Sequence, residues 1–450
     1  MRIIERLIGK SPVRLEDVAG AELDCPCGRR HVMAIDALVN RPGSVMEVGE
    51  FLSQRGCRRA WLIADERTYG AAGSQVEESC LAAGVDVKRS ILPGDPPPHA
   101  DREALGRLAF DLEAPALPII AVGSGTITDI ARFLAYRTGT SFVVVPTAPS
   151  MDGYTSSVAA MLVDGVRVTY PATSPRAIFA DPSIYSGAPA EFIAAGYAEI
   201  LGKLTALADW RLSSVLNDEY LCPLAEELVM DAVRPVLADP SSPSTLMDAL
   251  LWIGVAMNMM GNSRPASGAE HHLAHYWEMR ALWEGREPQS HGARVGVASV
   301  LVQEVYRELF VLRRESLPAL AARSQGVVHA TEDAIRAWYG PVASRLLKEQ
   351  AGWESRAYGA RPLDAQVLER AAQAIEPYLM SPESAREFLA RAGAPCHPRD
   401  LGLSQEALEI ALQAAKELRH RYTILHLASE LGLLQEVSRD LAGAVFRSGG

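Results

Sequence analysis

The side chains best suited to chemistry are one acid and three histidines. His271 and His275 stand four residues apart in the motif SRPASGAEHHLAHYW, so both project from one face of the helix expected to begin near residue 270. His291 precedes an apolar helical segment, and Glu199 lies in a stretch with helical periodicity. A carboxylate with two imidazoles can hold a catalytic divalent metal and leave positions open for substrate. These residues therefore predict a metal centre.

Two cations lie near these candidate ligands in the sequence. Lys203 is four residues after Glu199, so the two side chains share one helix face, and an ordinary surface ion pair is the alternative. Arg264 belongs to the loop before the histidine-bearing helix. From charge and position alone, Lys203 and Arg264 are candidates for binding a substrate phosphate.

A glycine-rich motif, GSGTITD at 123–129, follows the apolar run 116–122 and opens a helix. Glycines there let the backbone approach a pyrophosphate, and the helix N-terminus offers N–H groups and a positive dipole end. A tight turn without a ligand is the alternative. The motif is not the usual G-x-G-x-x-G fingerprint of dinucleotide sites.

A second polar loop, PTAPSMDGYTSS, follows the apolar run 141–146. Ligands of open α/β sheets bind at the carboxyl ends of the strands, where this loop is expected. Its prolines, glycine and hydroxyl groups indicate a fixed polar loop, and an ordinary loop rich in turn residues is the alternative.

The elements that must position these motifs divide into two groups. Strands separated by helical segments indicate an open parallel α/β sheet in a Rossmann-like domain over 1–188, and an all-helical domain follows over 189–450. The tract at about 325–395 is helical and charged, and no chemistry is attached to it. The expected strands lie at 60–64, 85–92, 116–122, 141–146, 158–163, 166–170 and 177–180, and the expected early helices at 72–83 and 102–112.

Composition limits the function classes. The chain has 450 residues and a net charge of −11, so it is a poor general binder of nucleic acid or of an anionic membrane. The apolar run 249–261 is too short to cross a bilayer and predicts a buried helix rather than membrane insertion. Six cysteines without a disulfide framework indicate a reducing, cytoplasmic compartment.

Cys25, Cys27 and His31 form the motif C-x-C-G-x-x-H. Two thiols and an imidazole could begin a zinc site. A fourth ligand is missing nearby and C-x-C is not the usual zinc spacing, so a buried turn is the alternative.

Together the motifs resemble the sn-glycerol-1-phosphate dehydrogenases, in particular their AraM-like branch. This family belongs to the iron-containing alcohol dehydrogenase and dehydroquinate synthase-like superfamily. The resemblance covers about 50–310 and returns near 419–432. It implies the dehydroquinate synthase-like fold, a nucleotide-binding domain and a helical metal- and substrate-binding domain. It departs at Glu199, where these dehydrogenases usually have Asp, so metal or substrate could differ.

Residue by residue, the resemblance implies a complete set of roles. Asp65 binds the adenosine end of the nucleotide, Asp152 and His275 are catalytic and contact substrate, and Glu199 lies at the substrate as well as at the metal. The implied metal ligands are Glu199, His271 and His291. The pyrophosphate is held by Gly123, Ser124, Gly125, Thr126 and Ile127. The nicotinamide side is lined by Thr147, Ala148, Pro149, Ser150 and Ser156.

The implied reaction is the reversible reduction of dihydroxyacetone phosphate to sn-glycerol 1-phosphate, with NAD or NADP and one divalent ion (zinc, nickel or iron). An acid at the end of a strand, Asp65, would repel a 2′-phosphate, which favours NAD. A homodimer is implied by the family alone. The alternatives are another superfamily member, either a glycerol or polyol dehydrogenase or a dehydroquinate synthase-like cyclase, and a non-catalytic binding protein on the same scaffold.

Overall fold

A computed structural model describes residues 2–163, 166–312, 317–324, 326, 329–351, 353 and 363–447 of the protein. The chain forms two compact units, each discontinuous in sequence. The first comprises Met1–Tyr197 and Pro223–Asn262, and the second comprises Ala198–Cys222 and Ser263–Gly450. Helices of the region 223–262 thus belong with the N-terminal residues, whereas the sequence analysis placed a single boundary between 188 and 189.

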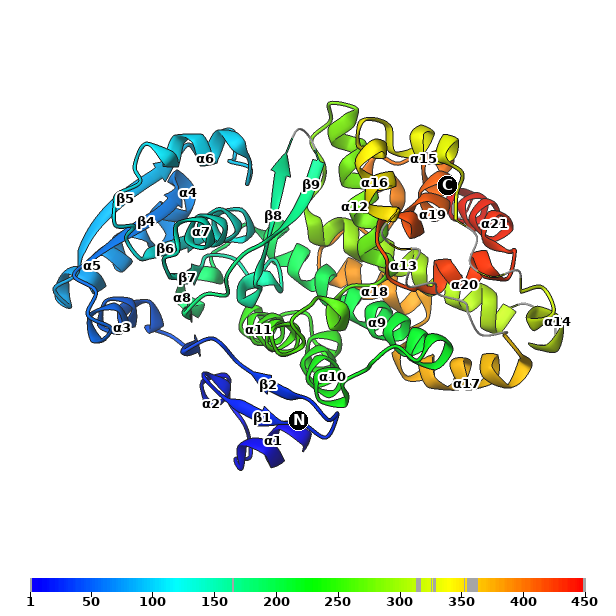
Figure 1. The fold of residues 1–450 in the computed structure, drawn as a ribbon, viewed down its shortest axis with the longest axis horizontal. Coiled ribbons are helices and arrows are strands. Elements are labelled where there is room, and N and C mark those ends of the chain that lie inside the picture. The colour runs from blue at the N-terminus through cyan, green and yellow to red at the C-terminus, as the bar shows by residue number, and fades with distance from the viewer. Residues whose placement is uncertain are drawn as a thin grey trace. The chain divides into compact units, whose positions relative to one another are not determined.

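Six parallel strands form the main sheet of the first unit, in the order β3-β10-β7-β6-β4-β5 (Figure 1). Every residue of β6 and β7 is buried, as expected of central strands in a parallel sheet. The prediction of a parallel α/β sheet is confirmed. The strands are β3 (Ala37–Asn40), β4 (Arg59–Asp65), β5 (Asp86–Leu92), β6 (Ile119–Gly123), β7 (Phe142–Pro146) and β10 (Ala177–Ala180).

The strands with strong apolar signals lie where the sequence placed them, with small differences at their ends. The strand expected at 116–122 begins only at Ile119. Pro118 has no N–H to donate to a neighbouring strand, although its carbonyl accepts from the Trp61 N–H at 2.8 Å. Three short strands were not predicted, namely β1 (Glu22–Asp24), β2 (Arg30–Val32) and β3.

A separate antiparallel pair is formed by β8 (Val158–Val163) and β9 (Val166–Pro171). This confirms the two strands of the predicted hairpin. Its predicted turn, Asp164-Gly165, lies outside the described residues.

Helices make up most of the remaining structure, and the two predicted early helices correspond to α5 and α6. In the first unit the helices are α1 (Arg2–Ile8), α2 (Leu15–Val18), α3 (Val48–Gln54), α4 (Glu66–Thr68), α5 (Ser74–Ala82), α6 (Arg102–Ala109), α7 (Gly125–Thr138), α8 (Pro182–Tyr185), α10 (Pro223–Ala238) and α11 (Pro243–Met260). The long helix α9 (Ala190–Asn217) begins in the first unit and continues into the second. The others are α12 (Ala269–Trp283), α13 (His291–Arg307), α14 (Leu317–Ala321), α15 (Glu332–Tyr339), α16 (Ala343–Gln350), α17 (Ala365–Ile375), α18 (Pro382–Arg391), α19 (Gln405–Ala414), α20 (Ile424–Glu430) and α21 (Leu434–Arg447).

The apolar run 249–261 lies mostly in α11, whose residues are largely buried, as the sequence predicted. Among the described residues, no helix combines the length and the apolar character that a bilayer crossing requires. The unmatched tract at 325–395 contains α15, α16, α17 and part of α18 in its described portion.

A buried arginine connects the two motifs that follow β6 and β7. Arg132 on α7 is 1% exposed and donates to Asp129 Oδ1 at 2.7 Å. It also donates to the carbonyls of Gly153 at 2.5 Å, Tyr154 at 3.1 Å and Val158 at 3.0 Å. One side chain on the helix of the glycine-rich turn therefore fixes the backbone of the second polar loop.

We predict that Arg132→Met lowers the free energy of unfolding by about 3–5 kcal/mol, because it leaves Asp129 and three carbonyls buried without their donor. Chemical denaturation of the full chain measures this. Arg137→Met is the matched control on the same helix, because Arg137 is exposed and stacks on the Phe133 ring at 5.0 Å. Equal effects of the two substitutions would contradict the role given to Arg132.

Candidate metal centre and nucleotide-binding turns

Glu199 lies within the long helix α9 and is 1% exposed. Its Oε1 accepts from Lys203 Nζ at 2.6 Å, one helical turn further along, and Lys203 is 0% exposed. The lysine also donates to the Ala266 carbonyl at 3.0 Å. The surface ion pair considered from the sequence is therefore wrong, because both charges are buried.

Three histidine rings surround this carboxylate. His271 Nε2 lies 3.1 Å from Glu199 Oε1, and His291 Nε2 lies 3.5 Å from Glu199 Oε2. The ring centroid of His275 lies 6.2 Å from that of His271 and 5.3 Å from that of His291. His271 and His275 belong to α12, whereas His291 is the first residue of α13 rather than a residue of the preceding loop. The structure thus brings together the four residues singled out by type and spacing.

Electrostatics keep the carboxylate ionised. Burial alone raises the pKa of Glu199, but Lys203, His271 and His291 outweigh burial and hold its pKa well below the usual range. Burial lowers the pKa of His291 well below its ordinary value. Burial likewise lowers the pKa of His275 to about 4, so the expectation that His275 titrates near neutrality is wrong.

The donor set fits a divalent metal. One oxygen of Glu199 and one nitrogen each of His271 and His291 lie within 4.8 Å of one another. Glu199 Oε2 is buried and accepts no hydrogen bond from any residue that the structure describes. A carboxylate and two imidazoles suit several first-row divalent ions and leave coordination positions open.

Neither sequence candidate for the substrate phosphate is an isolated cation. Lys203 is engaged with Glu199 as described, and Arg264 donates to Glu219 at 2.8 and 2.9 Å. Arg264 also donates to the carbonyls of Asp209 and Tyr422, both at 3.0 Å. These contacts give both cations a structural function.

The glycine-rich motif forms the turn between β6 and α7. β6 ends at Gly123 and α7 begins at Gly125. A Cβ on Gly123 would lie 2.6 Å from the Ile127 Cβ, so only glycine fits there. The Ile127 side chain is 1% exposed, which leaves its backbone as the part that could face a ligand. Ser124 and Thr126 complete this strand–turn–helix arrangement.

The second polar loop is fixed from several sides. Thr147, Ala148 and Pro149 are buried, whereas Ser150, Asp152 and Ser156 are partly exposed. The Tyr154 hydroxyl donates to the Ala148 carbonyl at 2.6 Å. A Cβ on Gly196 would lie 1.8 Å from the Pro149 carbonyl oxygen, so the start of α9 passes directly against this loop.

Asp65 stands at the end of β4, as the sequence analysis expected. Its Oδ1 accepts from the backbone N–H groups of Arg67 and Thr68, both at 2.9 Å, so the carboxylate caps α4. The negative charge remains at the carboxyl end of the strand, where it would face a nucleotide ribose in an open α/β sheet.

Two buried residues with clear functions were missed from the sequence. Glu270 is 0% exposed and its Oε1 accepts from His271 Nδ1 at 2.7 Å. An acid directly before a candidate histidine ligand could have indicated it. Arg132 could have been suggested by its position three residues after Asp129, although its loop partners could not.

Comparisons with known proteins place this geometry in a family. The profile of the iron-containing alcohol dehydrogenase family matches residues 39–189. The glycerol-1-phosphate dehydrogenase (NAD(P)+) of Geobacillus stearothermophilus is 32% identical over 431 residues, which cover 93% of this chain and 98% of that protein. The protein of the same name from Halalkalibacterium halodurans is 38% identical over 295 residues, which cover 63% of this chain and 74% of that protein.

Solved structures share the fold at low sequence identity. A probable glycerol dehydrogenase from Sinorhizobium meliloti has a TM-score of 0.61 and 15% identity, covering 92% of this chain and 98% of that one. A 1,3-propanediol oxidoreductase has a TM-score of 0.55 and 17% identity, covering 90% and 98%. The predicted fold class is confirmed. With full-length relatives above 30% identity, the chain belongs to the glycerol-1-phosphate dehydrogenase family.

Proposed function

We propose that this chain catalyses the reversible, metal-dependent and NAD(P)-linked reduction of dihydroxyacetone phosphate to sn-glycerol 1-phosphate. The observation that carries the proposal is the buried cluster of Glu199, His271 and His291, in a chain whose relatives bear that activity in their names. A cytoplasmic homodimer stays a prediction within this proposal.

Glu199, His271 and His291 are the proposed metal ligands. A divalent ion held there supplies Lewis-acid polarisation of the substrate carbonyl oxygen, and NAD(P) supplies or accepts the hydride. Lys203 keeps the Glu199 carboxylate ionised and oriented through its hydrogen bond at 2.6 Å. His275 is neutral at pH 7 because its pKa is about 4, so its imidazole is suited to pass a proton between its two ring nitrogens.

The nucleotide is assigned to the first unit. The backbone from Gly123 to Ile127 would face the pyrophosphate at the N-terminus of α7, and the loop from Thr147 to Ser156 would line the nicotinamide side. Asp152 is proposed to hold substrate. The charge of Asp65 favours NAD over NADP, since it would repel a 2′-phosphate.

A different arginine is better placed for the substrate phosphate than the two sequence candidates. Arg419 is partly buried and forms no ion pair with any residue that the structure describes. Burial, with Arg419 acting in the same direction, lowers the pKa of His275, which means that the guanidinium acts on the proposed catalytic histidine. We therefore assign the phosphate to Arg419, while Lys203 and Arg264 keep their structural partners.

NADH oxidation with dihydroxyacetone phosphate tests the function. We expect turnover that chelation abolishes and that zinc, nickel or iron restores, because the proposed ligands would polarise the carbonyl only through a bound ion. Persistent turnover after complete metal removal, or none with any of the three ions, would contradict the proposal.

The second prediction concerns Glu270, which accepts from Gly268 N at 2.6 Å, His271 Nδ1 at 2.7 Å and Thr205 Oγ1 at 2.8 Å. Its bond fixes the Nδ1–H tautomer of His271 and leaves Nε2 for the metal. Glu270→Gln places an NH2 group against these donors, so metal affinity should fall roughly 10- to 100-fold in a chelator competition. Glu284→Gln, just after the same helix, is the control and should leave the affinity unchanged.

The third prediction concerns Arg419. Arg419→Ala should raise the KM for dihydroxyacetone phosphate about 10- to 100-fold, the loss expected for a charged hydrogen bond. Catalytic efficiency with unphosphorylated dihydroxyacetone should not change, and Arg419→Lys should recover part of the affinity. An equal loss with both substrates would sink the assignment.

A further inference from the structure

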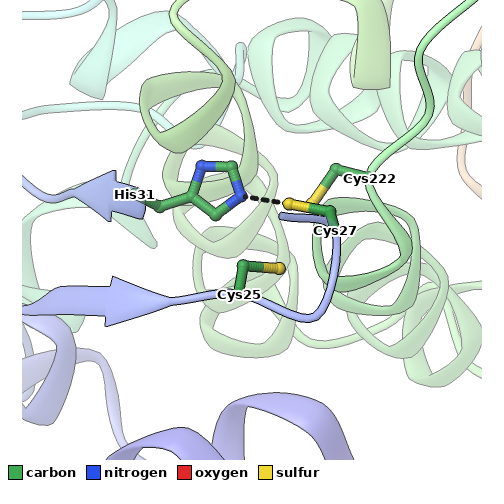
Figure 2. A group of neighbouring side chains, drawn as sticks. All are labelled: Cys25, Cys27, His31 and Cys222. Atoms are coloured by element: carbon green, nitrogen blue, oxygen red, sulfur yellow. Dashed lines mark hydrogen bonds between the residues drawn. The ribbon is translucent and has the colours of Figure 1, made fainter. Parts of the chain in front are cut away.

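A second cluster of metal-ligating side chains lies apart from the proposed catalytic residues. Cys25 and Cys27 stand in the turn between β1 and β2, and His31 stands in β2. Cys222 immediately precedes α10, a helix of the first unit. Figure 2 shows the three cysteine side chains and the imidazole directed toward one another.

The donor atoms of this group are close enough to share one ion. The three Sγ atoms and one nitrogen of His31 all lie within 4.8 Å of one another. Cys27 Sγ lies 3.4 Å from His31 Nε2 (Figure 2). Ligands around a tetrahedral zinc, with Zn–S about 2.3 Å and Zn–N about 2.0 Å, are separated by roughly 3.5–3.8 Å. Only a small contraction would complete such a site.

The histidine is already held in the orientation that a ligand needs. His31 Nδ1 lies 2.9 Å from the Met259 carbonyl, which can only accept, so Nδ1 carries the proton. The lone pair is then on Nε2, the atom that faces Cys27. A ligating histidine in metalloproteins almost always donates its other N–H to a carbonyl or carboxylate in this manner.

The cluster is also dry. Cys25 is 7% exposed, His31 3% and Cys222 0%. All six cysteines, each within the described ranges, are thiols rather than disulfides. Three thiols and one imidazole converging from distant parts of the chain exceed what a simple buried turn requires.

We propose that Cys25, Cys27, His31 and Cys222 bind a structural zinc ion. Three thiolates and an imidazole complete a tetrahedron, so no position is left for a substrate. Soft thiolate ligands select zinc over the hard cations that prefer oxygen. The fourth ligand, which the sequence motif alone lacked, is Cys222.

The ion would compensate for a weak element. β1 and β2 have three residues each, and an isolated two-stranded hairpin of this size is at best marginally stable in water. Zinc would join the hairpin to the start of α10 through Cys222, and the His31–Met259 hydrogen bond joins it to α11. Residues 22–32 would therefore be ordered by metal binding.

X-ray absorption at the zinc edge tests the site on the full-length zinc-loaded protein. To leave one kind of site, the measurement uses His271→Ala/His291→Ala, which removes two proposed catalytic ligands and none of this cluster. We expect about one zinc per chain with three sulfur neighbours near ~2.3 Å and one nitrogen. Zinc surrounded only by nitrogen and oxygen, or no retained zinc, would overturn the proposal.

A matched pair of cysteine variants in the same background gives the second measurement. Cys222→Ser should lower zinc affinity at least tenfold and make residues 22–32 more susceptible to proteolysis. Cys80→Ser is the control, because Cys80 is equally buried at 0% exposure but lies outside the cluster. Equal zinc content and affinity in the two variants would refute the role of Cys222. These readouts do not depend on catalytic activity.

Discussion

The second unit depends on charges buried in the middle of a helix. Glu199 and Lys203 are 1% and 0% exposed, and removing two charges from water costs on the order of several kcal/mol per ion. Their mutual hydrogen bond repays part of this cost, and the remaining donors and acceptors need fixed partners. Lys203 therefore binds the Ala266 carbonyl, and Glu199 faces His271. The loop before α12 and the ring of a proposed ligand are positioned by the same requirement.

Further along α9, Asp209 imposes a similar requirement on other elements. Its carboxylate accepts from the Tyr306 hydroxyl and from the backbone N–H groups of Ala269 and Ile424, each at 2.7 Å. Ala269 and Ile424 are the first residues of α12 and α20, so one side chain fixes where two helices begin. Since His271 is only two residues after Ala269, the direction of its side chain follows from this carboxylate.

Local signals in the sequence explain what could be predicted. The apolar runs that became β4, β6 and β7 carry their burial in their own composition, and α12 begins where its loop residues end. The strand β3 has four residues and exists through its pairing with β10, so periodicity could not reveal it. The same limit applies to Cys222, which only tertiary structure brings to the N-terminal hairpin. The helices α10 and α11 look like those of the second unit, and only their contacts place them in the first.

The substitution that the sequence left open is the glutamate at position 199. The resemblance to the dehydrogenases implied an aspartate there, whose carboxylate would lie one methylene closer to α9. The glutamate reaches His271 with one oxygen and His291 with the other, while Lys203 from the next turn of its own helix holds the first oxygen. The longer side chain therefore keeps both imidazoles within reach of one carboxylate. The change alters the distance from helix to carboxylate and leaves the number and type of donors unchanged, so it is compatible with the same metal chemistry.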